Sequence, residues 1–265
     1  MKRLPVIILF LVVGFPLILK AGSSSTSSNG AHYQPKFYPF DQGEKAEYRM
    51  SWNMIPVASA KVQTKAKWEK GEKLYQVNVK AKTWRVLHWI WKMRDSVESV
   101  FDAKTFSPRS FIFSQSENRE EVHTNIRYEP SDQKWVVRRR EGDKVEGYEF
   151  VSGDTYDPIS VSYLIRSLDF MVGDRLEFNL FGGHHRYLLT LDIVNQEPIK
   201  VKAGQFNAYK IESQMVKRSP SKDDGYVYRA TGWISADEKR ILVKAKSKAW
   251  IGSVYLELIH AEVRP

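Results

Sequence analysis

Apolar and polar side chains alternate with a period of two along most of the chain, and this alternation most constrains its fold. In residues 61–68 (KVQTKAKW) the even positions are apolar or small and the odd positions are polar. Residues 74–81 (LYQVNVKA) repeat the pattern, with apolar odd positions after Leu74. This period places one set of side chains on the buried face of a β-strand and the other set in water. The charged segment 69–73, which contains a glycine, predicts a hairpin between the two strands.

Similar short segments follow at regular spacing. They span residues 96–101, 109–116, 122–128, 134–140, 145–150, 175–180, 187–195, 206–214, 225–234, 242–247 and 253–261. Turns such as 130–132 (PSD) separate them, which is typical of an antiparallel meander. A sheet of so many strands curls, so the sequence predicts an all-β fold, an antiparallel meander curled into a barrel, half-barrel or clam. Lys and Arg at many outward positions favour a soluble barrel over an outer-membrane one.

One segment breaks the alternation and predicts a short helix over residues 157–168. Asp157 suits the N-cap position, and Pro158 suits the first helical position. The apolar side chains of the segment spread over a broad face and are Ile159, Tyr163, Ile165 and Leu168. Such a helix fills the concave side or one end of a curved sheet, and a mobile lid is the alternative.

The first residues have the layout of a secretory signal peptide. Lys2 and Arg3 precede a 16-residue apolar run, and Ala21 is followed by small polar residues. We expect residues 1–21 to be removed by cleavage after Ala21. The run is short for a spanning helix and contains Gly14 and Pro16, although an uncleaved anchor remains the alternative.

The remainder of the chain divides into a linker and a folded part. Residues 22–36 (GSSSTSSNGAHYQPK) are rich in Ser and Gly and predict a disordered linker. No second linker of this kind follows, so residues 37–265 are expected to form a single β-barrel-like domain.

The chain contains no cysteine and has a formal net charge of +10. The missing thiols exclude an N-terminal lipid anchor on cysteine, disulfides, thiolate zinc sites, iron–sulfur clusters and a cysteine nucleophile. An exported chain without cysteine suits the bacterial periplasm, where we expect this protein. Its basic excess suits anionic lipid head groups, lipopolysaccharide phosphates or cell-wall polymers, and nucleic acid is not an expected partner there.

Residue types that carry chemistry occur, but not in catalytic patterns. Residues 182–185 (GGHH) predict a turn rather than a metal site, because adjacent histidines on a strand point to opposite faces. The aspartate pairs 154 with 157 and 223 with 224 suit caps and turns better than acid–base catalysis. No catalytic residue, metal site or cofactor is therefore expected.

A tryptophan-rich segment, residues 83–94 (TWRVLHWIWKMR), is the most unusual part of the sequence. Large rings beside cations suit the mouth of a ligand cavity, a membrane interface or a protein-binding patch. Core packing is the alternative interpretation, and the two Trp residues at positions 52 and 68 are expected to face the same interior. The candidate ligand-binding residues are Trp84, Trp89, Trp91, Arg85, Lys92 and Arg94.

Four stretches are similar to a family of bacterial exported proteins catalogued as domain of unknown function 3108. They are residues 43–53 with 55–58, residues 95–102 with 107–108, residues 156–168 with 173–174, and residues 202–209 with 233–235 and the strand from 252. The resemblance implies a periplasmic, all-β, barrel-like protein and brings no activity or catalytic residues. This chain departs from the family pattern at residues 84–91.

These observations predict a periplasmic, non-enzymatic binding protein for an apolar or amphipathic envelope ligand, such as a lipid or a hydrophobic part of an envelope protein. The three tryptophans would line the cavity mouth, and the three cations would attract an anionic head group. The alternative is a structural or assembly scaffold of the envelope that acts through protein contacts, and an enzyme of cell-wall sugars or acyl chains ranks third. Membrane contact is expected to be peripheral at most. A cavity of about 300 Å³ would favour ligand binding over the scaffold.

Overall fold

Fifteen strands form one continuous sheet in the computed structural model, which describes residues 33–118, 120–183, 185–218, 227–249 and 252–263. The strands are β1 (Glu44–Trp52), β2 (Ile55–Glu69), β3 (Glu72–Thr83), β4 (Arg94–Asp102), β5 (Pro108–Glu117), β6 (Glu120–Glu129), β7 (Lys134–Glu141), β8 (Lys144–Val151), β9 (Thr155–Tyr156), β10 (Arg175–Phe181), β11 (Arg186–Val201), β12 (Gly204–Arg218), β13 (Val227–Ser235), β14 (Leu242–Ala249) and β15 (Gly252–Val263). The helix α1 spans Pro158–Ser167, and the short 3₁₀ helix η2 spans Arg85–Leu87. The predicted all-β fold with one helix is confirmed.

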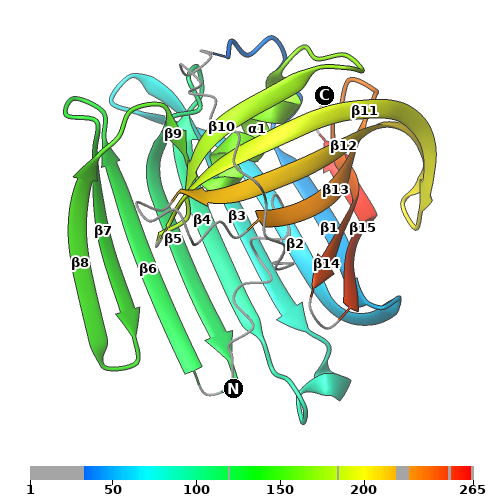
Figure 1. Cartoon of the computed structure of the whole chain (residues 1–265), viewed down its shortest axis with the longest axis horizontal. Coiled ribbons are helices and arrows are strands. Elements are labelled where there is room, and N and C mark those ends of the chain that lie inside the picture. Colours follow the sequence, from blue (N-terminus) through cyan, green and yellow to red (C-terminus); the bar gives the residue numbers. More distant parts are fainter. Residues whose placement is uncertain (1–32, 119, 184, 219–226, 250–251, 264–265) are drawn as a thin grey trace.

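The strands follow one another as a meander with a single long-range junction. Their order is β8-β7-β6-β5-β4-β3-β2-β1-β15-β14-β13-β12-β11-β10-β9. β1 pairs with both β2 and β15, so the first and last strands lie side by side in the middle of the sheet. All pairs are antiparallel except β9 with β10. In Figure 1 the sheet curls, so that β10–β13 cross in front of the broad layer formed by β3–β8.

Alternation explains which face of each strand is buried. In β3 the odd positions from Tyr75 to Thr83 are buried, and in β2 the even positions from Ala58 to Thr64 are buried. The two strands meet in the predicted hairpin, with Glu69 opposite Glu72. Lys70 and Gly71 both have positive φ at this turn, which matches the right-handed twist of the strands.

The helix α1 begins where the sequence predicts it. The Asp157 carboxylate accepts hydrogen bonds from the backbone N–H groups of Ile159 (2.8 Å) and Ser160 (3.0 Å), and its other oxygen accepts from the Ser99 hydroxyl on β4 (2.9 Å). Burial raises the pKa of Asp157 to about 6. Every helix residue except Ser162 is buried. The helix therefore forms part of the core, as expected for a helix that fills the concave side.

Aromatic side chains close the curled sheet where strand pairing stops. The Phe181 ring on β10 lies 5.5 Å from the Trp135 ring and 4.7 Å from the Phe150 ring, measured between centroids. These two partners come from β7 and β8, the far end of the sheet. The Tyr148 hydroxyl donates to the Gly183 carbonyl at 3.2 Å, and the Arg186 guanidinium lies 4.3 Å from the Phe150 ring. Side chains rather than backbone hydrogen bonds thus make the sheet barrel-like.

Gly183 shows why the predicted turn between β10 and β11 contains glycine. Its φ is +100°, and an added Cβ would lie 2.7 Å from the Thr124 methyl group on β6. The turn thus packs directly against β6, where a larger residue does not fit. His184 lies outside the described residues, within which no three His, Asp or Glu side chains are grouped to hold a metal.

Of the predicted signal peptide and linker, the structure describes only residues 33–36. The predicted signal peptide and residues 22–32 of the predicted linker lie outside the described residues. The last linker residues contact the fold, since Tyr33 packs on Phe178 with 4.7 Å between ring centroids and accepts a hydrogen bond from the Glu177 backbone. No helix within the described ranges has the length and apolar character to cross a membrane.

Candidate functional site

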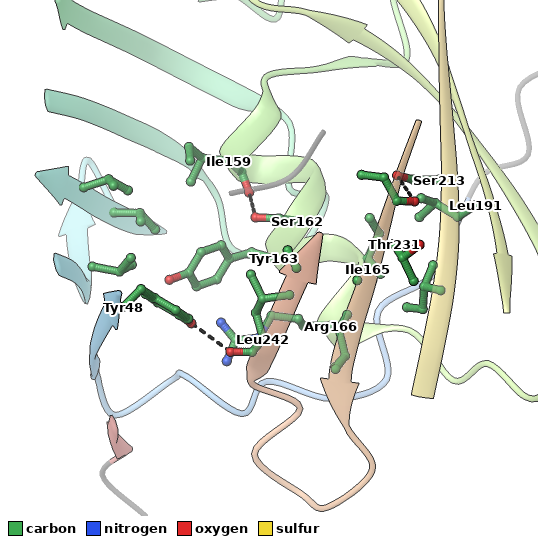
Figure 2. A pocket seen from close by; sticks show the side chains of 18 of the residues that line it. Tyr48, Ile159, Ser162, Tyr163, Ile165, Arg166, Leu191, Ser213, Thr231 and Leu242 are labelled. Carbon is green, nitrogen blue, oxygen red and sulfur yellow. Dashed lines mark hydrogen bonds between the residues drawn. The ribbon is translucent and has the colours of Figure 1, made fainter. Parts of the chain in front are cut away.

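An apolar cavity lies between α1 and two facing parts of the sheet. Its volume is about 110 Å³. One wall comes from β1–β3 and the other from β11–β14, as Figure 2 shows for Tyr48 on one side and Leu191 and Thr231 on the other. The apolar lining residues are Val62, Val77, Val79, Ile159, Ile165, Leu191, Ile211, Ala230, Gly232, Ile234, Leu242 and Ala245. The cavity therefore suits an apolar group.

A buried ion pair forms the polar end of this cavity. Arg166 on α1 donates to Glu44 on β1 through both terminal nitrogens, with 2.9 Å between Nη1 and Oε1. The Arg166 Nε donates to the Arg240 carbonyl at 2.6 Å. Only 7% of the Arg166 side chain and 2% of the Glu44 side chain are exposed. A bidentate pair of this kind holds the helix against the central strand of the sheet.

Two tyrosines complete the polar end and stay protonated. The Tyr48 hydroxyl donates to the Leu242 carbonyl at 3.1 Å, and the Tyr163 hydroxyl contacts the Thr64 hydroxyl and lies 3.4 Å from Glu44 Oε1. Burial, with the nearby Glu44 charge, raises the pKa of both tyrosines far above the ordinary value. These hydroxyls are hydrogen-bonding groups rather than bases at neutral pH.

The lining serine hydroxyls are also bonded to the protein itself. Ser162 donates to the Ile159 carbonyl at 2.7 Å, and Ser213 donates to the Ala230 carbonyl at 3.1 Å (Figure 2). Within the part of the chain that the structure describes, neither hydroxyl is hydrogen-bonded to a histidine or a carboxylate. The arrangement supplies shape and apolar surface, and not an activated nucleophile.

Two larger hollows have a different character. One, of about 370 Å³, includes Gln42, Lys45, Gln63 and Glu262 in its lining, and another, of about 390 Å³, includes Trp68, Glu72, Lys73 and Lys104. The lining of both hollows is more polar than that of the cavity beneath α1, although Tyr38, Trp68 and Tyr75 also line the second one.

The six predicted ligand-binding residues lie at the connection from β3 to β4 and outside the cavity. None of Trp84, Trp89, Trp91, Arg85, Lys92 and Arg94 lines it. Trp91 is half-buried against the core, and the other five are exposed. Their role in ligand binding stays a prediction. The expectation that Trp52 and Trp68 face the interior is wrong, because both side chains are exposed on β1 and β2.

Sequence reasoning missed the residues that form the cavity's polar end. Arg166 is a lone charge in the apolar helix segment, and this was the available signal that it needs a buried partner. Glu44 occupies a position in phase with the buried Ala46 and Tyr48 on β1. Pairing these two residues required the tertiary structure, because 122 positions separate them in the chain.

A second group of buried polar atoms lies where the β3–β4 connection joins β5. Trp91 Nε1, Asp95 Oδ2 and Glu117 Oε1 are buried without hydrogen-bond partners among the described residues. The other Asp95 oxygen accepts from the Ser116 backbone at 3.2 Å. Burial raises the pKa of Asp95 to about 7, and the Glu117 charge adds to the shift.

Fold and site together define a class, a barrel-like β-sheet protein with a small apolar interior cavity. A β-barrel-like protein of domain of unknown function DUF1849 from Brucella abortus is similar, with a TM-score of 0.56 and 11% sequence identity, over 84% of this chain and 98% of that chain. This likeness shows the fold alone. A "putative lipoprotein" from Parabacteroides distasonis aligns with a TM-score of 0.38 at 12% identity, over 86% of this chain and 100% of that one.

The family follows from the sequence itself. Residues 47–259 match the family described as "Protein of unknown function (DUF3108)", and the chain belongs to that family. The resemblance found in the four sequence stretches is thereby confirmed. A comparison with curated proteins gave no match.

We predict that removing one partner of the Arg166–Glu44 pair destabilises the fold far more than replacing both partners with apolar residues. Glu44→Leu or Arg166→Met alone leaves the partner charge buried and lowers the free energy of unfolding by about 3–5 kcal/mol. The double variant Glu44→Leu with Arg166→Met regains most of this loss. Urea unfolding measures all three, and Lys36→Met, which removes the exposed Lys36–Asp169 pair, serves as the control with little effect. Additive single losses in the double variant would contradict the prediction.

We predict that Asp95 makes stability fall as pH rises. Its folded pKa of about 7 exceeds the ordinary value of 3.8, so the folded state keeps a proton that the unfolded chain releases in this interval. The stabilisation that protonated Asp95 gives the folded state is complete below pH 3.8 and is lost as the pH rises through about 7. Asp95→Asn cannot ionise and should be more stable than the parent above pH 7, on the order of 1–3 kcal/mol. Urea unfolding at several pH values tests this, with Asp132→Asn on an exposed turn as the matched control; equal pH profiles for both variants would refute it.

Proposed function

We propose that this protein is an exported, non-enzymatic binding protein of the bacterial envelope that holds the apolar part of an amphipathic ligand. The observation that carries the proposal is the apolar cavity beneath α1, with its hydrogen-bonded polar end. Small residues on one wall, Ala230, Gly232 and Ala245, leave room that larger side chains would fill. Natural cores keep few voids of this size, because empty volume costs stability.

The volume limits what the cavity accepts. At about 110 Å³ it is well below the 300 Å³ or more of typical small-molecule sites. A whole lipid does not fit, whereas the end of an acyl chain or a small apolar group does. The polar remainder of such a ligand stays outside the cavity. The sequence predicted an apolar or amphipathic ligand behind a tryptophan-lined mouth. The cavity size restricts the bound part of such a ligand to a small apolar group.

The location in the envelope rests on the sequence. The basic n-region and apolar run of residues 1–21 support export, and the absence of cysteine suits the periplasm. The non-enzymatic role is supported by the hydroxyls of Tyr48, Ser162 and Ser213, which donate hydrogen bonds to backbone carbonyls. A binding role needs only the shape and the apolar lining.

Filling the cavity tests this function. We expect decanoate to bind the full chain in isothermal titration calorimetry, with a negative heat-capacity change from apolar burial. Ala245→Phe places a ring in the cavity and should weaken binding about tenfold or more, whereas Ala66→Phe, on exposed β2 surface outside the cavity, should not. Solvent extraction and mass spectrometry of gently purified protein should show a bound amphiphile. No decanoate binding together with no extracted amphiphile would overturn the proposal.

The small cavity also favours the second candidate, a scaffold that acts through protein contacts. β8 lies at one end of the strand order and pairs only with β7 in the described sheet. Its side chains are almost all exposed, including Val145, Tyr148 and Val151. An exposed edge strand is a template for adding a strand from a partner.

A photo-crosslinking residue at Glu146, which is exposed on β8, tests the scaffold function in intact cells. If a partner pairs with β8, discrete adducts form, and they disappear when Val145→Lys and Val151→Lys are added, because charges on an edge oppose strand addition. The same residue placed at Val194, exposed on β11, is the control. Equal adducts from both positions, or adducts insensitive to the lysines, would rule out pairing at β8.

A further inference from the structure

Exposed apolar side chains gather at one end of the sheet, where two connections adjoin. We call this surface the tryptophan rim; it comprises Met54, Ile55, Trp84, Val86, Trp89 and Ile90. The exposed fractions reach 66% for Met54, 72% for Val86 and 84% for Trp89. The connection with η2 lies at the lower end of the sheet in Figure 1.

The two parts of the rim are held next to each other. Thr83 pairs with Ala58 at the ends of β3 and β2, and the Trp84 backbone N–H donates to the Val57 carbonyl at 3.0 Å. Met54 and Ile55 lie just before Val57 in the chain, where the turn from β1 enters β2. The apolar side chains of both connections thus belong to one surface.

Hydrogen bonds fix the connection in this exposed position. The Thr83 N–H donates to the Met93 carbonyl at 3.2 Å, and the Thr83 hydroxyl accepts from the Met93 N–H at 3.1 Å. Lys92 and Asn118 exchange two further bonds, of 3.0 Å and 2.7 Å. A tethered backbone that presents large apolar side chains to water marks an interaction surface.

The two connections that form the rim carry charges of one sign, and the nearby acids, Glu117 and Glu120, belong to the adjoining turn between β5 and β6. Residues 52–57 and 84–94 contain no Asp or Glu, whereas Arg85, Lys92 and Arg94 are exposed. None of these three cations has an ion pair within the part of the chain that the structure describes. Uncompensated cations beside apolar and indole side chains complement a surface that is anionic outside and apolar beneath.

We propose that the tryptophan rim docks on an anionic lipid bilayer. Trp89, Val86 and Ile90 enter the region between head groups and acyl chains, while Arg85, Lys92 and Arg94 contact lipid phosphates. A projecting connection buries its side chains more fully in a deformable lipid surface than against a rigid protein face. The inference does not depend on the cavity, since none of these residues lines it.

The absence of cysteine permits a local test in the full chain. In the variant Val86→Cys the new cysteine is the sole thiol, and it is labelled with an environment-sensitive fluorophore. Val151→Cys is the matched control, because Val151 is 67% exposed and lies at the end of β8 that is far from the rim. On vesicles of equal parts phosphatidylglycerol and phosphatidylcholine, the label at 86 should shift to the blue and be quenched by brominated lipid, and the label at 151 should not. Because the label reports its own surroundings, attachment through residues 1–21 does not mimic this result.

Charge removal and lipid composition complete the test. Arg85→Gln, Lys92→Gln and Arg94→Gln should weaken docking about fivefold per removed charge, read from the lipid-buried fraction of the label at 86. Vesicles of phosphatidylcholine alone should bury less label. If the label at 86 stays in water on anionic vesicles, docking on lipid is refuted, and a crosslinked protein at that position would identify a protein surface instead. Decanoate binding is measured separately, so the proposal for the cavity and the proposal for the rim are tested independently.

Discussion

The buried pair between Arg166 and Glu44 is the interaction on which the interior arrangement depends. A curled sheet of fifteen strands has a concave face that must be covered, and α1 covers it. The pair ties that helix to β1, which is also the strand that joins the two halves of the sheet. Two ions this deeply buried are tolerated because each finds a bidentate partner, and Arg166 also donates to the Arg240 carbonyl.

The cavity is a consequence of this arrangement. The Arg166–Glu44 pair holds α1 at the polar end of the cavity. The small side chains of β13 and β14 then leave unfilled space opposite the valines of β2 and β3. The Arg166 guanidinium is hydrogen-bonded to Glu44 and to the Arg240 carbonyl, which explains why an apolar site can exist beside a buried charge. The size and the apolar lining of the cavity are the properties on which the proposed binding function rests.

The fold separates two kinds of surface. The cavity is lined by small apolar groups and ends at the hydrogen-bonded Arg166–Glu44 pair, while the tryptophan rim consists of exposed apolar side chains and is flanked by cations without ion pairs among the described residues. Asp95, whose pKa is raised by burial, lies between the cavity side of the sheet and the tryptophan rim, where the connection to β4 enters the sheet beside Glu117. Membership of the DUF3108 family and the likeness to a barrel-like structure describe the scaffold, and both surfaces are properties of this chain's own residues.

The sequence by itself determined the helix and most of the strands. Period-two alternation located the strands of the meander apart from β1 and the two-residue β9, and Asp157 with Pro158 located the start of α1, because both signals are local. Only the tertiary structure decided that Glu44 meets Arg166, that Phe181 closes the barrel against Trp135, and that the tryptophans of residues 84–91 lie outside the cavity. Alternation gives each side chain one of two faces, but which distant residues share a face depends on how the sheet curls, and that curl follows from contacts between strands far apart in the chain.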